Sequence, residues 1–366
     1  MNRKKALAVL MAAAMTSSIF GAVPAMASED KPFEGQEITF ADTGGGSWDE
    51  KLEPIIAKFE EETGAKVNME LYAHSDYLEM LQVKLPSESD DYDVIGVDVP
   101  LVASYATKGW IAPIDSYFTD DEKAQFASSA LDAGTWDGVF YCPAMNSSSQ
   151  LLWYNTELLD EAGVEVPESS VENRLTWEQV VDMAKKTLEV VDPDGTKGIG
   201  GIAFEQVSRT YQMNQIPNSL GGKNIGDDGY TAQGVINDDA WIEGATWYQN
   251  LFKDGVALQG FTADDTGSFF RAGKIVFLIG GTWTDNNCKN EEMDTYGYAP
   301  VPAFEGHEDQ VGTPTGSWHF GIPVNAKNKD LAAEFIKYMS IGEGNELWLE
   351  ANGDVPATIA GADKIM

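Results

Sequence analysis

Short apolar runs alternate with amphipathic stretches along most of the chain. After an apolar run at 37–40, typical of a strand, Leu52, Ile55, Ile56 and Phe59 recur at helical spacing. We expect further strands at 67–71, 93–97, 150–154, 199–204, 275–279, 296–300 and 318–322. We expect further helices at 77–85, 102–106, 156–162, 176–190, 239–252 and 329–339. Strands that alternate with helices form mostly parallel sheets, so the pattern predicts an α/β fold.

The first 27 residues have the three-part pattern of a secretory signal peptide. Three basic residues at 3–5 precede an apolar run at 6–20, and residues 25–27 read Ala-Met-Ala, a small-residue cleavage site. No Cys lies beside that site to carry a lipid. We therefore expect removal of residues 1–27 and a polar leader at 28–36. The mature chain is expected to be soluble and either periplasmic or extracellular, at the outer face of the cytoplasmic membrane.

The composition narrows the classes of partner. The formal net charge is −35, and a surface of that sign repels nucleic acid and anionic lipid. A 43% hydrophobic content is enough for packed cores, and the length of 366 residues suggests about two domains. Three His and two Cys show no metal-ligand spacing, so we expect neither a metal nor a cofactor. The sequence leaves open whether Cys142 and Cys288 form a disulfide.

Several segments share their residues, order and spacing with one known family. They are FEEETGAKV at 59–67, YDVIGVDV at 92–99, KGWIAPID at 108–115, GVFYCPAMNSSSQLLWYNTELLDEAGV at 138–164, TWEQVVDMAKK at 176–186, NSLGG at 218–222, RAGKIVFLIGGTW at 271–283 and TGSWHFGIPVNAKNKDLAAEFIKYMS at 315–340. On these segments, from about Ile38 to Pro356, the chain resembles the bacterial extracellular solute-binding proteins of family 1. That group includes maltose- and oligosaccharide-binding proteins.

The resemblance implies a two-lobed periplasmic-binding-protein fold of type II. Its hinge is crossed more than once, and its ligand cleft lies between the lobes. The N-terminal lobe is expected at 36–144 plus 317–352, and the C-terminal lobe at 145–316 plus 353–366. The implied function is capture of a sugar or oligosaccharide by hinge closure, for delivery to the permease subunits of an ABC importer. We expect a monomer that catalyses no reaction.

Sugars are bound by an aromatic plane against the ring face and by planar polar groups aimed at the hydroxyls. The candidate residues lie where predicted strands end or where the hinge is expected; they are Ser47, Trp48, Asp98, Asn146, Ser148, Arg209, Tyr211, Trp283, Asp285 and Trp318. Trp283 is the first choice, because the resemblance implies an aromatic ligand platform there. Asp98 could instead cap the next helix, and Tyr211 could pack within its lobe.

Two other functions remain open at this point. A binding protein for a charged solute, a polyamine or a sugar phosphate, would use Asp98 and Asp285 for a cation or Arg209 for an anion. A secreted glycosidase would need two carboxylates at a fixed separation. With 59 acidic residues some pair always looks suitable, and no nucleophile motif is present. Sugar capture is the hypothesis that the sequence favours.

Overall fold

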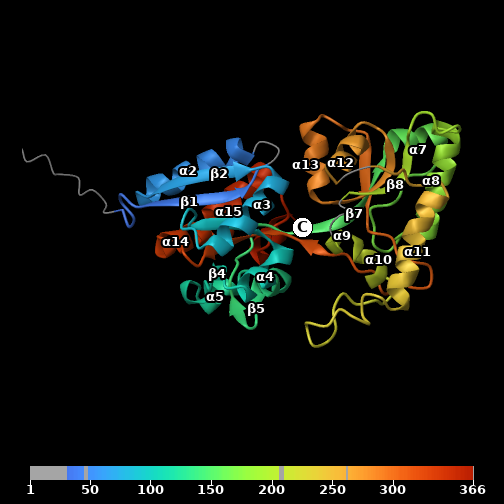
Figure 1. The fold of residues 1–366 in the computed structure, drawn as a ribbon. Coiled ribbons are helices and arrows are strands. Elements are labelled where there is room, and N and C mark those ends of the chain that lie inside the picture. The colour runs from blue at the N-terminus through green and yellow to red at the C-terminus, as the bar shows by residue number, and fades with distance from the viewer. Residues whose placement is uncertain (1–30, 45–47, 206–209, 261–262, 366) are drawn as a thin grey trace, which may run out of the picture.

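Two lobes, each built on its own sheet, make up the protein (Figure 1). The computed structural model describes residues 31–44, 48–205, 210–260 and 263–365. The predicted signal peptide at 1–27 lies outside these residues. No helix of the described part is both long and apolar enough to cross a bilayer.

The first lobe has a five-stranded sheet in the order β2-β1-β3-β12-β4. Its strands are β1 (Glu37–Thr43), β2 (Lys66–Tyr72), β3 (Val94–Asp98), β4 (Ile111–Ala112) and β12 (Trp318–Pro323), and a hairpin of β5 (Thr135–Trp136) and β6 (Val139–Phe140) lies beside it. Its helices are α2 (Trp48–Thr63), α3 (His74–Lys84), α4 (Val102–Thr107), α5 (Asp120–Lys123), α6 (Ser128–Ala133), α14 (Lys329–Ser340), α15 (Glu343–Asn352) and α16 (Ile359–Ile365), with short 3₁₀ turns at Leu85–Ser87, Val99–Leu101 and Asp115–Tyr117. β1, β2 and β3 are parallel, whereas β12 runs antiparallel to both of its neighbours.

The second lobe has a sheet in the order β10-β7-β9-β8, with β11 also paired to β7. Its strands are β7 (Ser148–Asn155), β8 (Gly200–Phe204), β9 (Ile275–Gly281), β10 (Tyr296–Ala299) and β11 (Thr315–Gly316). Its helices are α7 (Thr156–Ala162), α8 (Trp177–Val191), α9 (Thr210–Met213), α10 (Gln215–Asn218), α11 (Asp239–Lys253), α12 (Ala263–Arg271) and α13 (Trp283–Asn290). Every residue of β9 is buried, as its unbroken apolar run predicts.

The two lobes have separate hydrophobic cores. In the first, Phe40 of β1 packs against Phe320 of β12 and Phe335 of α14, with ring centroids 5.8 and 5.4 Å apart. In the second, Trp177 of α8 packs against Trp247 of α11 at 4.9 Å. The described core clusters each draw their residues from one lobe. The lobes can therefore rotate relative to each other without opening a core.

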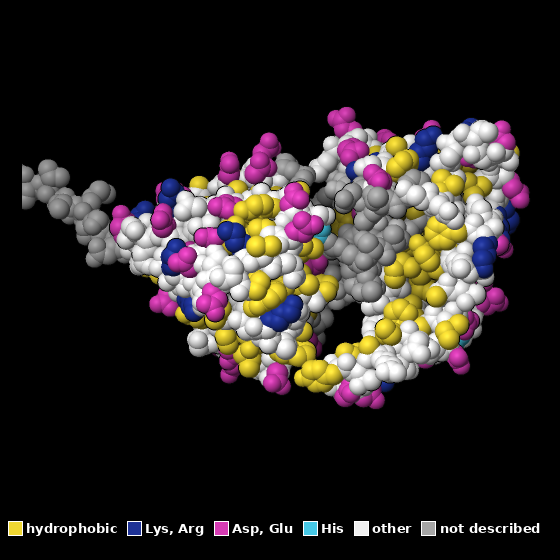
Figure 2. Space-filling model, viewed as in Figure 1, with side chains coloured by type: hydrophobic (Ala, Val, Ile, Leu, Met, Phe, Trp, Pro, Cys, Tyr) yellow, Lys and Arg dark blue, Asp and Glu magenta, His cyan; other side chains and the backbone are white. Residues whose placement is uncertain are grey.

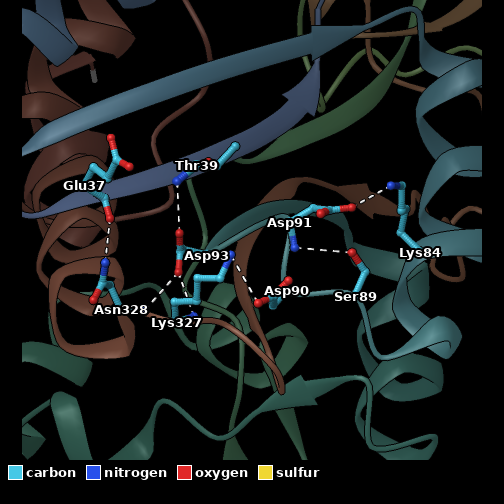
Figure 3. Close-up of polar contacts among 9 residues, drawn as sticks. All are labelled: Glu37, Thr39, Lys84, Ser89, Asp90, Asp91, Asp93, Lys327 and Asn328. Carbon is cyan, nitrogen blue, oxygen red and sulfur yellow. Dashed lines mark hydrogen bonds and ion pairs between the residues drawn. The ribbon is translucent and has the colours of Figure 1, made fainter.

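A buried carboxylate ties the returning segment of the chain to the first lobe. Asp93 accepts hydrogen bonds from the backbone N–H groups of Lys327 and Asn328, both at 2.9 Å, and from Thr39 at 3.0 Å (Figure 3). Asn328 also donates its side-chain amide to the carbonyl of Glu37 at 2.6 Å. The segment that carries α14 is thus held against β1, far away in the sequence.

Two segments cross between the lobes side by side. In the first, Met145 donates its N–H to the carbonyl of Trp318 at 2.8 Å, and Ser148 is paired with Gly316 of the second. A third segment reaches the crossing, because Ser147 donates its N–H to Val355 at 2.7 Å. The hinge is therefore crossed more than once, as predicted.

The tail of the chain differs from the prediction, which assigned 353–366 to the second lobe. After Val355 the chain returns to the first lobe, where Ala127 donates its N–H to the carbonyl of Ala357 at 2.9 Å. Ala357 is buried in the first lobe's core, and Lys364 pairs with Glu346 of α15 at 2.8 Å. The assignment is wrong from Ala357 onward, since backbone pairing and an apolar contact hold this tail to the first lobe.

The two cysteines are both free and buried. Cys142 packs among residues of the first lobe, and Cys288 packs among residues of the second. No disulfide joins them in this structure.

Candidate functional site

One end of each sheet, where its strands begin or end, faces the crossing segments. We call these two ends the edges of the lobes. β7 begins at Ser148, directly after the first crossing, and the antiparallel β9 ends beside that start, with Gly281 paired to Gln150. In the first lobe β12 begins at Trp318, directly after the second crossing, and Asp98 at the end of β3 is paired with it. The carboxyl ends of parallel strands are where α/β proteins place ligands. Figure 2 shows that the surface is hollowed between the lobes.

A buried polar cluster lies at the edge of the second lobe. Trp283, at the start of α13, donates its indole N–H to both carboxylate oxygens of Glu205, at 2.9 and 3.0 Å. Gln212 of α9 donates its amide to Gln150 Oε1 at 3.0 Å and to Glu205 Oε2 at 3.5 Å. Burial raises the pKa of Glu205, and the hydrogen bond from Trp283 partly opposes that rise. The indole of Trp283 is therefore fixed in orientation, although the residue is only half-buried.

Gly281 makes the position of that indole possible. A Cβ atom added to Gly281 would overlap the six-membered ring of Trp283. Any side chain there would push the ring away from the end of β9 and break its bonds to Glu205. The pair Gly281 and Trp283 therefore acts as one structural unit.

An aromatic group lies at the edge of the first lobe. The half-buried Trp318 packs edge-to-face on His74 at 5.8 Å and against Tyr77 at 6.2 Å. Tyr77 is itself anchored, because its hydroxyl donates to the carbonyls of Gly96 at 2.7 Å and Ala41 at 3.0 Å. Trp318 is thus positioned by packing beside the carboxylate of Asp98, its partner on β3.

Sequence reasoning did not single out Asp42, a second carboxyl at this edge. It lies near the end of β1 and is buried; its Oδ1 accepts the N–H of Thr43 at 2.7 Å, while its Oδ2 has no hydrogen-bond partner. The side chain lies over Gly96, where a Cβ atom would overlap it. Burial raises the pKa of Asp42 well above its usual value, and the charge of Asp98 adds to the rise. A carboxyl residue at the end of an apolar strand was the signal that could have identified it.

Comparison with known proteins identifies the family. The family model described as "Bacterial extracellular solute-binding protein" matches residues 42–340, most of the chain. The chain belongs to this family. The family and the two-lobed α/β fold predicted from the sequence are therefore confirmed, and the family is one of solute-binding proteins of transport systems rather than of enzymes.

Three similar proteins illustrate the likeness. A putative binding protein of Brucella abortus is 24% identical over 312 residues, which are 83% of this chain and 72% of that one. The sn-glycerol-3-phosphate-binding periplasmic protein of Agrobacterium fabrum is 26% identical over 230 residues, 61% of this chain and 50% of that one. The solved solute-binding protein of Thermotoga lettingae, bound to α-D-tagatose, is 21% identical with a TM-score of 0.77, over 90% of this chain and 83% of that one.

In this solute-binding protein several of the predicted site residues have roles within the structure. Asn146 accepts the N–H of Trp318 at 2.9 Å and donates to Asp354 at 2.6 Å. Both ends of its amide therefore form hydrogen bonds that hold the crossing segments together. Asp285 accepts the hydroxyl of Tyr296 at 2.7 Å and pairs with Lys289 at 2.6 Å. Contacts of Asn146 and Asp285 with a ligand stay predictions.

The remaining predicted residues of the solute-binding protein fall into three groups. Trp48, at the start of α2, packs edge-to-face on Trp348 at 4.8 Å, and Ser148 begins β7 at the hinge. Ser47 and Arg209 lie outside the described residues, and for Tyr211 only the backbone of α9 is described. Asp98, Trp283 and Trp318 lie at the two facing edges. Glu205, Gln150 and Gln212 were missed, because their pairing with Trp283 depends on tertiary contacts.

Within the described ranges, no group of three His, Cys, Asp or Glu side chains is placed to hold a metal ion. The side chains that the structure describes at the two edges can form hydrogen bonds and aromatic stacking contacts.

Proposed function

We propose that this protein captures a sugar or an oligosaccharide between its lobes and delivers it to the permease subunits of an ABC importer. The observation that carries the proposal is the arrangement of Trp283 on one edge and Trp318 on the other, each beside a carboxyl group. Aromatic faces suit the C–H faces of a sugar ring, and carboxyl and amide groups suit its hydroxyls. The Thermotoga lettingae protein, whose structure holds a sugar, supports the same ligand class.

Hinge closure supplies the mechanism in this proposal. A sugar that stacks on one lobe gains contacts with the other lobe when the two approach, and water leaves the cleft. The ligand then stabilises the closed form by the difference in its affinity for the two forms. The separate cores allow this motion, because neither core has to open when the crossing segments bend. The chain acts as a monomer and catalyses no reaction.

A charged solute is the second candidate function. The Agrobacterium fabrum relative, which is a sn-glycerol-3-phosphate-binding protein, favours a phosphate ester. However, three carboxyl groups, those of Asp42, Asp98 and Glu205, lie among the described residues of the two edges. Phosphate is best bound by cationic side chains or backbone N–H groups, so these carboxyl groups favour a neutral sugar over a phosphate ester. A polyamine would fit their charge, and the binding assay should include it.

The test measures ligand binding by the mature chain, with tryptophan fluorescence and the melting temperature as the two signals. The panel contains monosaccharides, maltotriose, longer oligosaccharides, a polyamine and sn-glycerol 3-phosphate. We expect a saturable response to a carbohydrate, with at least about a tenfold loss of affinity in Trp283→Ala, because a stacked ring contributes on the order of 1–2 kcal/mol. Trp110→Phe, a change at a half-buried tryptophan outside the two edges, is the matched control and should bind as the wild type.

The outcomes separate the two functions. A response to the polyamine or the phosphate alone would replace sugar capture by the charged-solute function. A folded protein that responds to no carbohydrate of the panel would contradict sugar capture.

We also propose that the chain is exported and processed after Ala27. Amino-terminal sequencing of the protein from the extracytoplasmic fraction should then begin near Ser28. A cytoplasmic chain that retains its first residues would contradict this.

A further inference from the structure

The lobes touch at a second place, distant in sequence from the crossing segments. The rings of Trp136 and Tyr230 meet edge-to-face, with centroids 6.3 Å apart and planes at 84°. Trp136 belongs to β5 of the first lobe, and Tyr230 lies in the loop at 219–238, between α10 and α11 of the second. In Figure 1 this loop extends from α10 and α11 toward β5, below β7. The contact therefore spans the gap between the lobes.

The loop is built to hold Tyr230 at its tip. Asp228 Oδ1 accepts the N–H groups of Tyr230 at 2.9 Å and Thr231 at 2.8 Å, and its Oδ2 accepts the Thr231 hydroxyl at 2.5 Å. The base of the loop is tied to α11, because Trp241 donates its indole N–H to the carbonyl of Lys223 at 2.8 Å. These hydrogen bonds fix the tip and the base of the loop, so the loop holds Tyr230 in place for its contact with Trp136.

Core packing does not explain the position of Tyr230. Its side chain is 76% exposed, and a large aromatic ring gains little from such a site unless it has a partner. The ring partner that the structure gives it is Trp136 of the other lobe.

Trp136 is fixed from its own side as well. The hairpin of β5 and β6 turns at Asp137 and Gly138, whose φ angles of 49° and 74° are those of a tight type I′ turn. Thr135 is paired with Phe140, which is buried in the first lobe's core. Both halves of the contact are therefore anchored to the rigid part of their own lobe.

We propose that Trp136 and Tyr230 form an aromatic clasp across the mouth of the cleft, which holds the lobes together and slows the release of a bound solute. Figure 2 shows an opening between the lobes. An exposed edge-to-face pair shifts the equilibrium between open and closed forms by roughly twofold to tenfold. The retention of solute rests on the proposed function; the clasp itself does not.

The clasp is tested first without any ligand. Spin labels are placed at Val83→Cys of the first lobe and Val190→Cys of the second, which are 68% and 50% exposed. Cys142 and Cys288 are buried and stay unlabelled. The distances between the labels are then measured in the wild type, Tyr230→Phe, Tyr230→Ala and Trp136→Ala.

We expect the wild type and Tyr230→Phe to share one distance distribution, because the Phe ring keeps the contact. Tyr230→Ala and Trp136→Ala should both gain a population with the labels further apart, and the double variant should match the single variants. Circular dichroism and melting temperature should stay unchanged in Tyr230→Ala, since its side chain is exposed. A distribution in Tyr230→Ala that superimposes on that of the wild type would overturn the proposal.

The effect on retention is measured with maltotriose as the first probe, and with whichever carbohydrate of the panel binds. We expect the dissociation rate to rise about twofold to tenfold in Tyr230→Ala and to stay at the wild-type value in Tyr230→Phe. An equal dissociation rate in all three proteins would contradict the role in retention. If the wild type binds no carbohydrate, the proposed function fails, while the label distances still decide whether the clasp exists.

Discussion

Asn146 donates a hydrogen bond of 2.6 Å to Asp354, although 208 positions separate the two residues in the sequence. Asp354 also accepts the indole N–H of Trp348 at 3.0 Å and the side-chain amide of Asn352 at 2.9 Å. Asn146 in turn holds the N–H of Trp318 in the second crossing segment. The carboxylate of Asp354 therefore bonds to the first crossing segment and to α15. Through Asn146 it is also connected to the second crossing segment.

Asp354→Ala should lower the free energy of unfolding by about 2–4 kcal/mol, because it leaves three largely buried donors without their acceptor. Urea unfolding followed by circular dichroism measures the change. Asp363→Ala, at an exposed position of α16, is the matched control and should stay within about 0.5 kcal/mol of the wild type. A variant of Asp354 as stable as this control would show that the carboxylate does not hold the crossing together.

Asp42→Asn should raise the melting temperature at pH 7. Burial raises the pKa of Asp42, so the folded protein still holds this proton at pH values where the unfolded chain has released it. A rise in pH from 3.8 through the raised pKa therefore favours the unfolded state, and this cost persists above that range. The asparagine carries no titrating group, and we expect a gain of at least about 2 °C.

The gain in Asp42→Asn should shrink as the pH falls from the raised pKa of Asp42 through 3.8, because below that value the carboxyl is mostly protonated in both states. Asp91→Asn is the matched control with the opposite sign, because its exposed pair with Lys84 lowers the pKa of Asp91. A melting temperature of Asp42→Asn equal to or below that of the wild type at pH 7 would contradict the prediction.

His319→Gln should flatten the loss of stability in mild acid. The Nδ1–H of His319 donates to the carbonyl of Cys142 at 2.7 Å, so its Nε2 accepts the hydroxyl of Ser317 at 2.7 Å, and burial lowers the pKa of this neutral ring to about 4. The unfolded chain binds the proton at about pH 6.5, so stability falls by about 3 kcal/mol as the pH drops from 6.5 to 4.

Unfolding free energies measured over this pH range should therefore converge in the wild type and His319→Gln as the pH falls. Parallel profiles would mean that His319 is not responsible for the acid sensitivity. His307→Gln is the matched control and should parallel the wild type; this half-buried histidine lies in a surface loop, with its Nδ1 3.4 Å from Gln310 Oε1.

The thiols of Cys142 and Cys288 should be unreactive in the folded protein. Both are buried, and burial raises the pKa of both, to about 11 for Cys288. A thiol reagent should therefore titrate close to zero groups in the native protein and two after denaturation. A reductant should leave the melting temperature unchanged, because no disulfide is present to break. Rapid reaction of either thiol in the native state would contradict this burial.

The strand-helix alternation could be predicted from the sequence, because apolar runs such as 275–279 are long enough to require burial on both faces. The helix α13 was not predicted. Its residues 283–290 are polar except for Trp283 and Cys288, and its place is decided by contacts of Thr284 and Cys288 rather than by an amphipathic pattern. Helix formation there depends on β9, which precedes it.

The candidate site was predictable as separate residues but not as a cluster. Trp283 could be singled out by its position after two glycines, whereas its partner Glu205 lies 78 positions away. A hydrogen bond over that distance follows from the parallel pairing of β8 and β9, which the sequence does not reveal. Likewise, nothing in the sequence indicated that both ends of the Asn146 amide bond to other segments of the hinge, whereas its contact with a ligand stays a prediction.

β12 lies between β3 and β4 in the sheet, although it follows them by some two hundred residues. A chain that emerges from its amino end therefore presents β1 to β4 with the place between β3 and β4 still vacant. All strands of the second lobe fall within 148–316, so that lobe completes its sheet before residue 318 has been made. The first lobe, although it begins the chain, is therefore the last to complete its sheet. A chain that ends before Pro323, through incomplete synthesis or cleavage, leaves β3 and β4 each with an unpaired edge beside the core of the first lobe.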